Sequence, residues 1–226
     1  MVSNKANDDL VVKIQKIFDN IKNFNYEEAF FLSCEIMERN ENGDQLFHEW
    51  VKSLVEFYSC NKRDNAIKFL EKIRPTKLEN EIHFRIVNSL MCFYREVGNK
   101  KDFIKYKKII YSYIDKVENV ELKHKIIYNI ANGFYTFKDY EKALEYSDES
   151  IAIGREKGIF NMDFSLSIMV KIMSLFYLGK HKEGHELKEL LINYLEVTGN
   201  INHKSYLEKA LERFYEKEGC KGEKCT

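Results

Sequence analysis

The sequence has little of what interrupts helices. It contains one proline, Pro75, and ten glycines in 226 residues. An all-β protein or a loop-rich enzyme needs more of both residues at its turns, whereas Lys, Glu, Leu and Ile recur here at helical spacing. Hydrophobic residues make up 44% of the chain, which is enough to bury a sizeable core. These features predict an all-α fold.

The sequence also lacks an excess of charge of either sign. Its 36 Lys and Arg residues balance its 36 Asp and Glu residues, so no overall field draws the chain to nucleic acid. No apolar run approaches the roughly 18 residues of a membrane-spanning helix. The first residues, MVSNKANDDLVVKIQ, lack the order of a signal peptide. We therefore expect a cytoplasmic protein that contacts neither nucleic acid nor membrane directly.

Catalytic motifs that can be recognised locally are missing as well. There is no phosphate-binding glycine loop, no GxSxG and no HExxH. His181 and His185 share a helical face, but their surroundings, GKHKEGHELKE, favour a solvated helix start over a metal site. We expect no enzymatic activity, no cofactor and no metal.

The five cysteines fall into two groups. Cys34, Cys60 and Cys92 lie in helical patterns, where buried thiols pack as small hydrophobes. Cys220 and Cys225 lie in the polar end EKEGCKGEKCT, with no further ligand nearby to complete a zinc site. We expect an unstructured end there, with a reversible disulfide as the alternative.

What the sequence does have is a repeat of helix, short polar turn and second helix. Two antiparallel helices that approach closely at a tight turn need a small residue on each. In IIYNIANGFYTFKDYEKALEYSDESI, Ala131 and Ala143 meet this need. Five segments align with steps of 37, 37, 40 and 41 residues on Ala29, Ala66, Phe103, Ala143 and Gly184. The third and fifth units depart from the pattern, with Phe103 and Ile172 where small residues are expected.

The period resembles that of the tetratricopeptide repeat (TPR), which is about 34 residues. Such hairpins stack into a right-handed superhelix with an inner groove. We expect a single TPR-like domain over residues 1–217 and a flexible tail at 218–226, with a continuous helix at 100–116. The expected hairpins are at about 8–39, 44–73, 79–116, 120–157 and 161–197, followed by a capping helix at 201–217.

In a repeat of this type the first helix of each hairpin lines the groove. Residues three or four apart point into it: Arg85, Asn88, Cys92 and Arg95 from the third unit, Lys125, Tyr128, Asn129, Asn132 and Tyr135 from the fourth, and Leu166, Met169, Met173, Phe176 and Tyr177 from the fifth. Carboxamides can pair with a peptide backbone, cations with a carboxylate, and Met and Phe can form an adaptable apolar pocket. Alternatively, the asparagines are ordinary surface residues and the Met and Phe side chains are core.

Two segments carry a resemblance to a known family. The stretch quoted above and RIVNSLMCFYREVGN resemble the repeats of the RRNPP group of cytoplasmic peptide-pheromone receptors of Gram-positive bacteria, which includes PlcR, NprR and Rgg. The resemblance implies a short linear signalling peptide as ligand and a regulatory role in quorum-sensing transcription. It also implies Asn129 and Asn88 as clamps on the peptide backbone. Cys92 departs from the pattern, since relatives can carry asparagine there.

Most members of the group begin with a DNA-binding helix-turn-helix domain, which this sequence does not show. We expect a non-enzymatic peptide-sensing module. The alternatives are a generic TPR scaffold without a peptide ligand and, ranked last, a regulatory inhibitor of the Rap type. A homodimer is expected from apolar residues on the terminal helices that no further repeat covers: Leu187, Leu190, Leu191, Leu195, Tyr206, Leu207 and Phe214.

Overall fold

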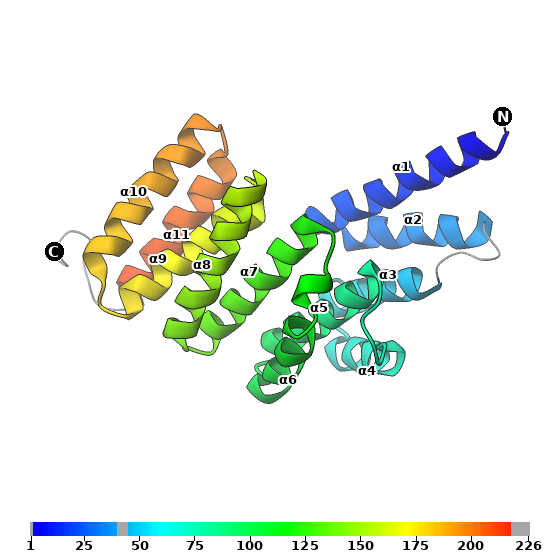
Figure 1. Ribbon diagram of the computed structural model, residues 1–226, viewed down its shortest axis with the longest axis horizontal. Coiled ribbons are helices and arrows are strands. Elements are labelled where there is room, and N and C mark those ends of the chain that lie inside the picture. The colour runs from blue at the N-terminus through cyan, green and yellow to red at the C-terminus, as the bar shows by residue number, and fades with distance from the viewer. Residues whose placement is uncertain (1, 40–44, 218–226) are drawn as a thin grey trace. The chain divides into compact units, whose positions relative to one another are not determined.

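The computed structural model describes residues 2–39 and 45–217 (Figure 1). Within these ranges every regular element is helical, which confirms the predicted all-α class. The elements are α1 (Val2–Lys22), α2 (Tyr26–Arg39), α3 (Gln45–Tyr58), α4 (Arg63–Ile73), α5 (Glu81–Glu96), α6 (Lys100–Tyr111), the 3₁₀ helix η1 (Ile114–Lys116), α7 (Val120–Thr136), α8 (Tyr140–Lys157), α9 (Met162–Tyr177), α10 (His181–Val197) and α11 (Ile201–Lys217).

The chain forms two compact units, one that ends at Lys116 and one that begins at Val117. The first unit contains α1 to α6, and the second contains α7 to α11. The single domain over 1–217 stays a prediction. Cys220, Cys225 and the predicted tail at 218–226 lie outside the described residues.

The helix expected over residues 100–116 is interrupted, so this prediction was wrong in its second half. α6 ends at Tyr111, and η1 follows after a turn. The Ser112 hydroxyl donates to the carbonyl of Ile109 over 2.8 Å, and such local bonds compete with the helical ladder. The N–H of Tyr113 then bonds to the carbonyl of Ile110 at 3.2 Å, which is the tighter 3₁₀ spacing.

One turn geometry closes all five hairpins. A residue with positive φ follows the end of the first helix of each hairpin by two or three positions. It lies five positions before the alignment position of its repeat: Phe24, Asn61, Gly98, Lys138 and Gly179. In the third and fourth hairpins the next N–H bonds back to the first helix, from Asn99 to Tyr94 at 2.8 Å and from Asp139 to Phe134 at 2.9 Å. These are the bonds of a Schellman motif, which stops one helix and starts the next within a few residues.

The small residues of the repeat lie where the helices touch. Ala29, Ala66 and Ala143 are fully buried. A Cβ atom added to Gly184 would lie 2.7 Å from the ring of Phe176, so that position has no room for a side chain. Phe103, which stands where a small residue is expected, is also fully buried, so the third hairpin accommodates a ring at this place.

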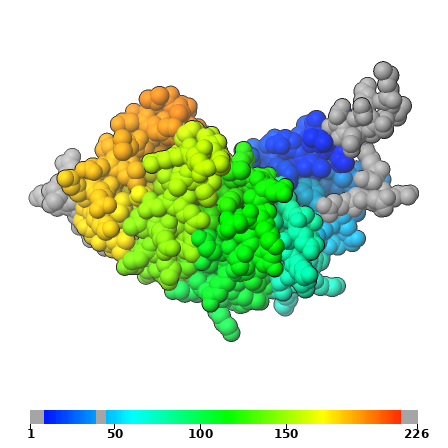
Figure 2. Space-filling model, viewed as in Figure 1, coloured from blue at the N-terminus to red at the C-terminus, as the bar shows by residue number. Residues whose placement is uncertain are grey.

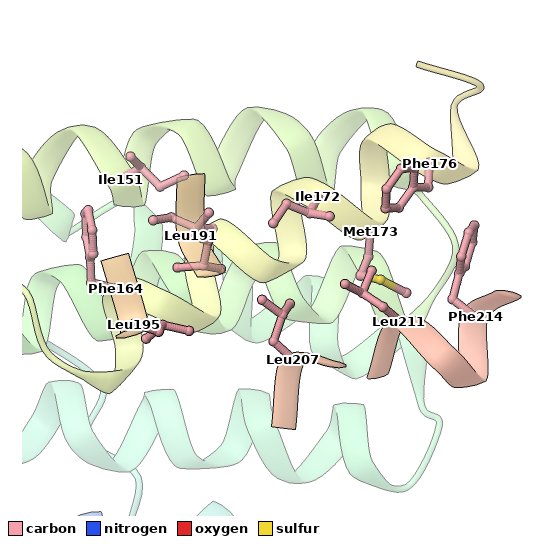
Figure 3. Close-up of a cluster of buried hydrophobic side chains, with 11 residues drawn as sticks. Ile151, Phe164, Ile172, Met173, Phe176, Leu191, Leu195, Leu207, Leu211 and Phe214 are labelled. Carbon is pink, nitrogen blue, oxygen red and sulfur yellow. The ribbon is translucent and has the colours of Figure 1, made fainter. Parts of the chain in front are cut away.

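Unit 2 is held together by consecutive helix contacts. α7 and α8 pack against each other, and their surfaces adjoin on the face shown in Figure 2. Farther along the chain, α9, α10 and α11 share an apolar cluster (Figure 3). Burial of each such side chain contributes about 1.5–3 kcal/mol, so α11 is an integral part of the unit.

The expected apolar surface on the terminal helices is mostly absent, which corrects the sequence analysis. Leu191, Leu195, Leu207 and Phe214 are at most 5% exposed, because α10 and α11 cover them against α9. Leu190 remains 66% exposed, and Tyr206, on α11, remains 54% exposed. The original reason for expecting a dimer therefore applies to a much smaller area.

The expected packing of the cysteines is also partly wrong. Cys60 is exposed, because α3 ends two residues before it and leaves it in the turn. Cys34 and Cys92 are half-buried within α2 and α5.

Candidate functional site

Apart from Asn129 and Tyr177, the predicted groove residues form one stripe that recurs on the first helix of three hairpins. Adding 40 to the number of an α5 residue gives its counterpart on α7, and adding a further 41 gives its counterpart on α9. These are the repeat steps from Phe103 to Ala143 and from Ala143 to Gly184. The equivalent sets are Arg85, Lys125 and Leu166; Asn88, Tyr128 and Met169; Cys92, Asn132 and Met173; and Arg95, Tyr135 and Phe176. We call the four members on α7, which are Lys125, Tyr128, Asn132 and Tyr135, the α7 stripe.

Asn129 does not belong to this stripe. By the same shifts it is the counterpart of Ser89 on α5 and Val170 on α9, both of which are buried. Ser89 accepts a hydrogen bond from the indole of Trp50 at 2.9 Å, so this position faces the neighbouring hairpin in unit 1. Asn129 is only 7% exposed and Asn88 only 8%. The two asparagines implied as clamps therefore occupy different positions of the repeat, and both are largely enclosed.

All four side chains of the α7 stripe are half-buried and can be reached from solvent. The carboxamide nitrogen of Asn132 donates to the Tyr128 hydroxyl over 3.3 Å. The Lys125 ammonium lies 4.0 Å from a carboxylate oxygen of Asp163 at the start of α9. A cation, a phenol and a carboxamide thus lie within two turns of one helix. The hydrogen bond of Asn132 and the ion pair of Lys125 are both long.

The corresponding cations of unit 1 are already engaged. The Arg85 guanidinium lies 2.5 Å from the Glu81 carboxylate and 4.1 Å from the ring centroid of Phe18. Arg95 pairs with Glu96 over 2.5 Å. A guanidinium held by a carboxylate and an aromatic face is preorganised by the fold. Among the cations of the three stripes, Lys125 lies farthest from its carboxylate partner.

The apolar half of the predicted site divides into surface and core. Leu166 and Met169 are half-buried. Met173 and Phe176 are 6% and 2% exposed, and they point toward Leu211 and Phe214 of α11 (Figure 3). The rings of Phe176 and Phe214 stack with centroids 5.5 Å apart.

Leu166 and Met169 border a crevice between α9, α10 and α11. Tyr206 and Leu207 line its opposite side, and it leaves a cavity of only about 10 Å³. That volume holds about one water. Leu166 and Met169 therefore offer a contact surface. The apolar pocket expected beside Met173 and Phe176 is filled by side chains of α11.

Three tyrosines, Tyr135, Tyr140 and Tyr177, meet at the end of α7, and Tyr140 was not among the predicted site residues. Tyr140 stacks on Tyr177 with centroids 4.4 Å apart and rings almost parallel. Tyr135 lies 5.9 Å from Tyr140 and 6.1 Å from Tyr177. Burial, together with the two neighbouring phenols, raises the pKa of Tyr135, so its hydroxyl stays a neutral hydrogen-bonding group. Tyr140 could have been found from the shared turn, since it is the first residue of α8.

His124, near the start of α7, is a second residue that sequence reasoning missed. Its side chain is fully buried, and neither ring nitrogen has a hydrogen-bond partner. Burial lowers its pKa, although Asp163 and Glu121 act in the opposite direction. A neutral imidazole therefore packs beside Phe164, with ring centroids 6.4 Å apart. Its position within the buried face of a periodic helix was the available signal.

The described residues show no metal centre and no membrane segment. No group of three or more His, Cys, Asp or Glu side chains in residues 2–39 and 45–217 could hold a metal ion. The rings of His181 and His185 both pack against Phe176, at 6.1 and 5.0 Å. None of the helices in those ranges is long and apolar enough to cross a membrane.

Comparison with known families gives a match over most of the chain. The model of the RNPP family C-terminal domain matches residues 1–167. One curated protein, "Uncharacterized protein BU087" of Buchnera aphidicola, is 23% identical over 150 residues. That match covers 63% of this chain but 14% of the longer relative.

Solved structures with the same fold include PlcR and TPR-like repeats. Bacillus thuringiensis PlcR in its apo form superposes with a TM-score of 0.77 and 19% identity over 92% of this chain and 81% of that chain. PlcR in complex with the peptide PapR7 and DNA superposes with a TM-score of 0.72 and 19% identity, over 88% of this chain and 75% of that chain. TPR-like repeats described as a putative kinesin light chain of Podosopora anserina superpose with a TM-score of 0.60 and 14% identity, over 84% of this chain and 96% of that chain. At these identities the likeness shows the fold, which is TPR-like.

Proposed function

The chain belongs to the RNPP family, and from that premise we propose that it is a non-enzymatic regulatory module that senses a short linear peptide. The observation that carries the proposal is the α7 stripe, which presents a loosely paired cation, a phenol and a carboxamide on one accessible helix face. The structure of PlcR with the peptide PapR7 supports the ligand class by analogy.

The chemistry of the stripe suits an extended peptide. A peptide backbone offers alternating N–H donors and carbonyl acceptors, and the Asn132 carboxamide can pair with one of each. The terminal or side-chain carboxylate of a peptide can replace Asp163 at Lys125, because an ion pair at 4.0 Å that solvent can reach contributes about 0–1 kcal/mol and is easily exchanged. Leu166 and Met169 of α9 add an apolar surface beside the polar stripe.

Peptide binding would regulate the module through the packing of α7 on α9. A ligand shifts a conformational equilibrium only by as much as it prefers one state. A peptide that replaces the Lys125–Asp163 contact favours states in which these helices separate at that point. In this proposal the module works in the cytoplasm as a homodimer, with a signalling peptide as ligand and without direct contact with nucleic acid.

The test is a binding screen with fluorescein-labelled linear peptides of five to ten residues, followed by fluorescence polarisation on variants. We expect Lys125→Ala and Asn132→Ala to weaken the best peptide at least about tenfold, since each removes a charge-assisted or amide contact. Lys142→Ala is the matched control, because Lys142 is an exposed lysine on α8 that pairs with Asp139 over 2.8 Å. Equal affinity for all three variants and the parent contradicts the proposed site.

Asn129→Ala and Asn88→Ala test the clamps that the family resemblance implies. Both side chains are largely buried, so each variant needs a thermal unfolding curve beside its binding curve. A loss of affinity without a loss of stability supports a clamp. A loss of stability with unchanged affinity assigns the asparagine to packing.

A scaffold function without a peptide ligand is the second candidate. The observation that favours it is the exposed apolar surface around the α10–α11 turn, where Val197 is 89% exposed and Ile201 72%. A partner captured through this surface should remain bound to Lys125→Ala and Asn132→Ala and be lost on Val197→Asp. The peptide proposal requires the reverse pattern.

A further inference from the structure

Unit 1 contains a cavity that the peptide proposal does not use. Its volume is about 110 Å³, and its wall comes from α1, α2 and α3. All the residues that line it except Ser33 are half-buried, so the cavity opens to solvent. An apolar cavity of about 150 Å³ in another protein stays dry and takes up benzene. The apolar part of the wall here consists of Leu10, Ile14, Ile36, Met37 and Phe47.

One polar pair interrupts this apolar wall. Ser33 is 1% exposed, and its hydroxyl donates to the carbonyl of Phe30 over 2.7 Å. A hydroxyl has one proton, so at 3.0 Å from His48 Nδ1 the Ser33 oxygen accepts the hydrogen bond. This arrangement places the imidazole proton on Nδ1 and leaves Nε2 of His48 as an acceptor.

The His48 acceptor is available at neutral pH. Burial, and then the nearby Lys52, lower the pKa of His48, so the ring is neutral near pH 7. Within the described residues, Nε2 has no hydrogen-bond partner. No Asp, Glu, Lys or Arg among these residues lines the cavity, so an ionised ligand would lose its hydration without compensation.

We propose that this cavity binds a small neutral aromatic molecule that carries one hydrogen-bond donor, of the phenol class. The ring occupies the space between Ile14, Ile36 and Phe47. The donor bonds to Nε2 of His48. The site lies in unit 1 and the α7 stripe lies in unit 2, so the two proposals can be tested independently.

The experiment is an NMR titration of the full chain, labelled on isoleucine and methionine methyl groups, with phenol, toluene and benzoate as probes. We expect phenol to shift the methyl signals of Ile14, Ile36 and Met37 with a Kd of about 0.1–1 mM. Toluene should bind about five- to tenfold more weakly, because it lacks the donor. Benzoate should not shift these signals. The proposal is overturned if phenol at about 10 mM leaves them unchanged or if toluene binds as tightly as phenol.

Two kinds of variant separate the hydrogen bond from the volume. His48→Phe keeps an aromatic ring but removes the acceptor. The affinity for phenol should therefore fall to that for toluene, and the affinity for toluene should stay as in the parent. Ile36→Phe fills the cavity and should abolish both. Because either variant can unfold unit 1, the methyl signal of Met91, which is fully buried in that unit, serves as a folding check. Ile14→Phe fills the same space from α1. Unchanged phenol binding in folded His48→Phe refutes the proposed acceptor.

Discussion

The unpartnered imidazole of His124 gives a quantitative test of the structure. The side chain is fully buried in unit 2, and both ring nitrogens lack a hydrogen-bond partner. Leaving a buried polar group unsatisfied costs about 1–3 kcal/mol. His124→Leu removes that cost and keeps a similar volume. We expect it to raise the free energy of unfolding by about 1–2 kcal/mol at pH 7, and the melting temperature by about 3–6 °C.

The same residue predicts a dependence of stability on pH. Burial lowers the pKa of His124 in the folded chain, so the unfolded chain binds a proton more readily. Stability is therefore complete above the unfolded pKa of about 6.5 and falls as the pH drops below it. The loss from this group between pH 7 and pH 5 is at most about 2 kcal/mol. In His124→Leu this contribution should vanish.

The assay is urea unfolding followed by circular dichroism at pH 7.5, 6.5, 5.5 and 5.0. The matched control is His83→Leu, because His83 Nδ1 accepts a hydrogen bond from the N–H of Glu79 over 3.2 Å. The free energy of unfolding of His83→Leu should be unchanged or lower than that of the parent by about 0.5–1.5 kcal/mol. The reasoning is refuted if His124→Leu is destabilised by more than about 1 kcal/mol, or if its pH dependence equals that of the parent.

Three further predictions concern the turns, the packing and the assembly. Phe24→Gly should raise the free energy of unfolding by about 0.5–1 kcal/mol in urea unfolding, because Phe24 has φ +62° and is 67% exposed; a loss contradicts the turn geometry. Gly154→Ala should lower the free energy of unfolding by about 1–2 kcal/mol, since the added Cβ would lie 2.5 Å from the ring of Phe164. A more stable variant would contradict this packing. Sedimentation velocity should show a dimer for the parent and a monomer for Leu190→Glu, whose parent residue is 66% exposed; a monomeric parent ends the dimer proposal.

The helices were predictable because their signals are local. α4, α8 and α10 end at the expected residues, and α11 has the expected bounds. Turn residues repeat at a fixed distance from the alignment positions, and the helical period fixes which face is apolar. The break after α6 depended on one serine hydroxyl, Ser112, for which the sequence pattern gave no warning.

The site was predictable only in part, because burial depends on contacts distant in sequence. The helical period predicted that the four residues of the α7 stripe share one face of a helix. It could not show that α11 fills the surface beside Met173 and Phe176. The position of Asn129 was open to a stricter treatment. Aligning the first helices by the repeat steps makes Tyr128, rather than Asn129, the counterpart of Asn88. The fully buried, unpartnered His124 has no signature in sequence at all beyond its apolar neighbours.

Peptide recognition by the α7 stripe can be tested most directly by NMR on the full chain with the tightest peptide from the polarisation screen. Saturating peptide should shift the side-chain amide signal of Asn132 and the methyl signal of Met169, since both residues are half-buried and reachable from solvent. The methyl signal of Met37 in unit 1 should stay in place. Shifts confined to Met37, or to the backbone of α8 and α10 with Asn132 unchanged, would contradict a peptide site on this stripe.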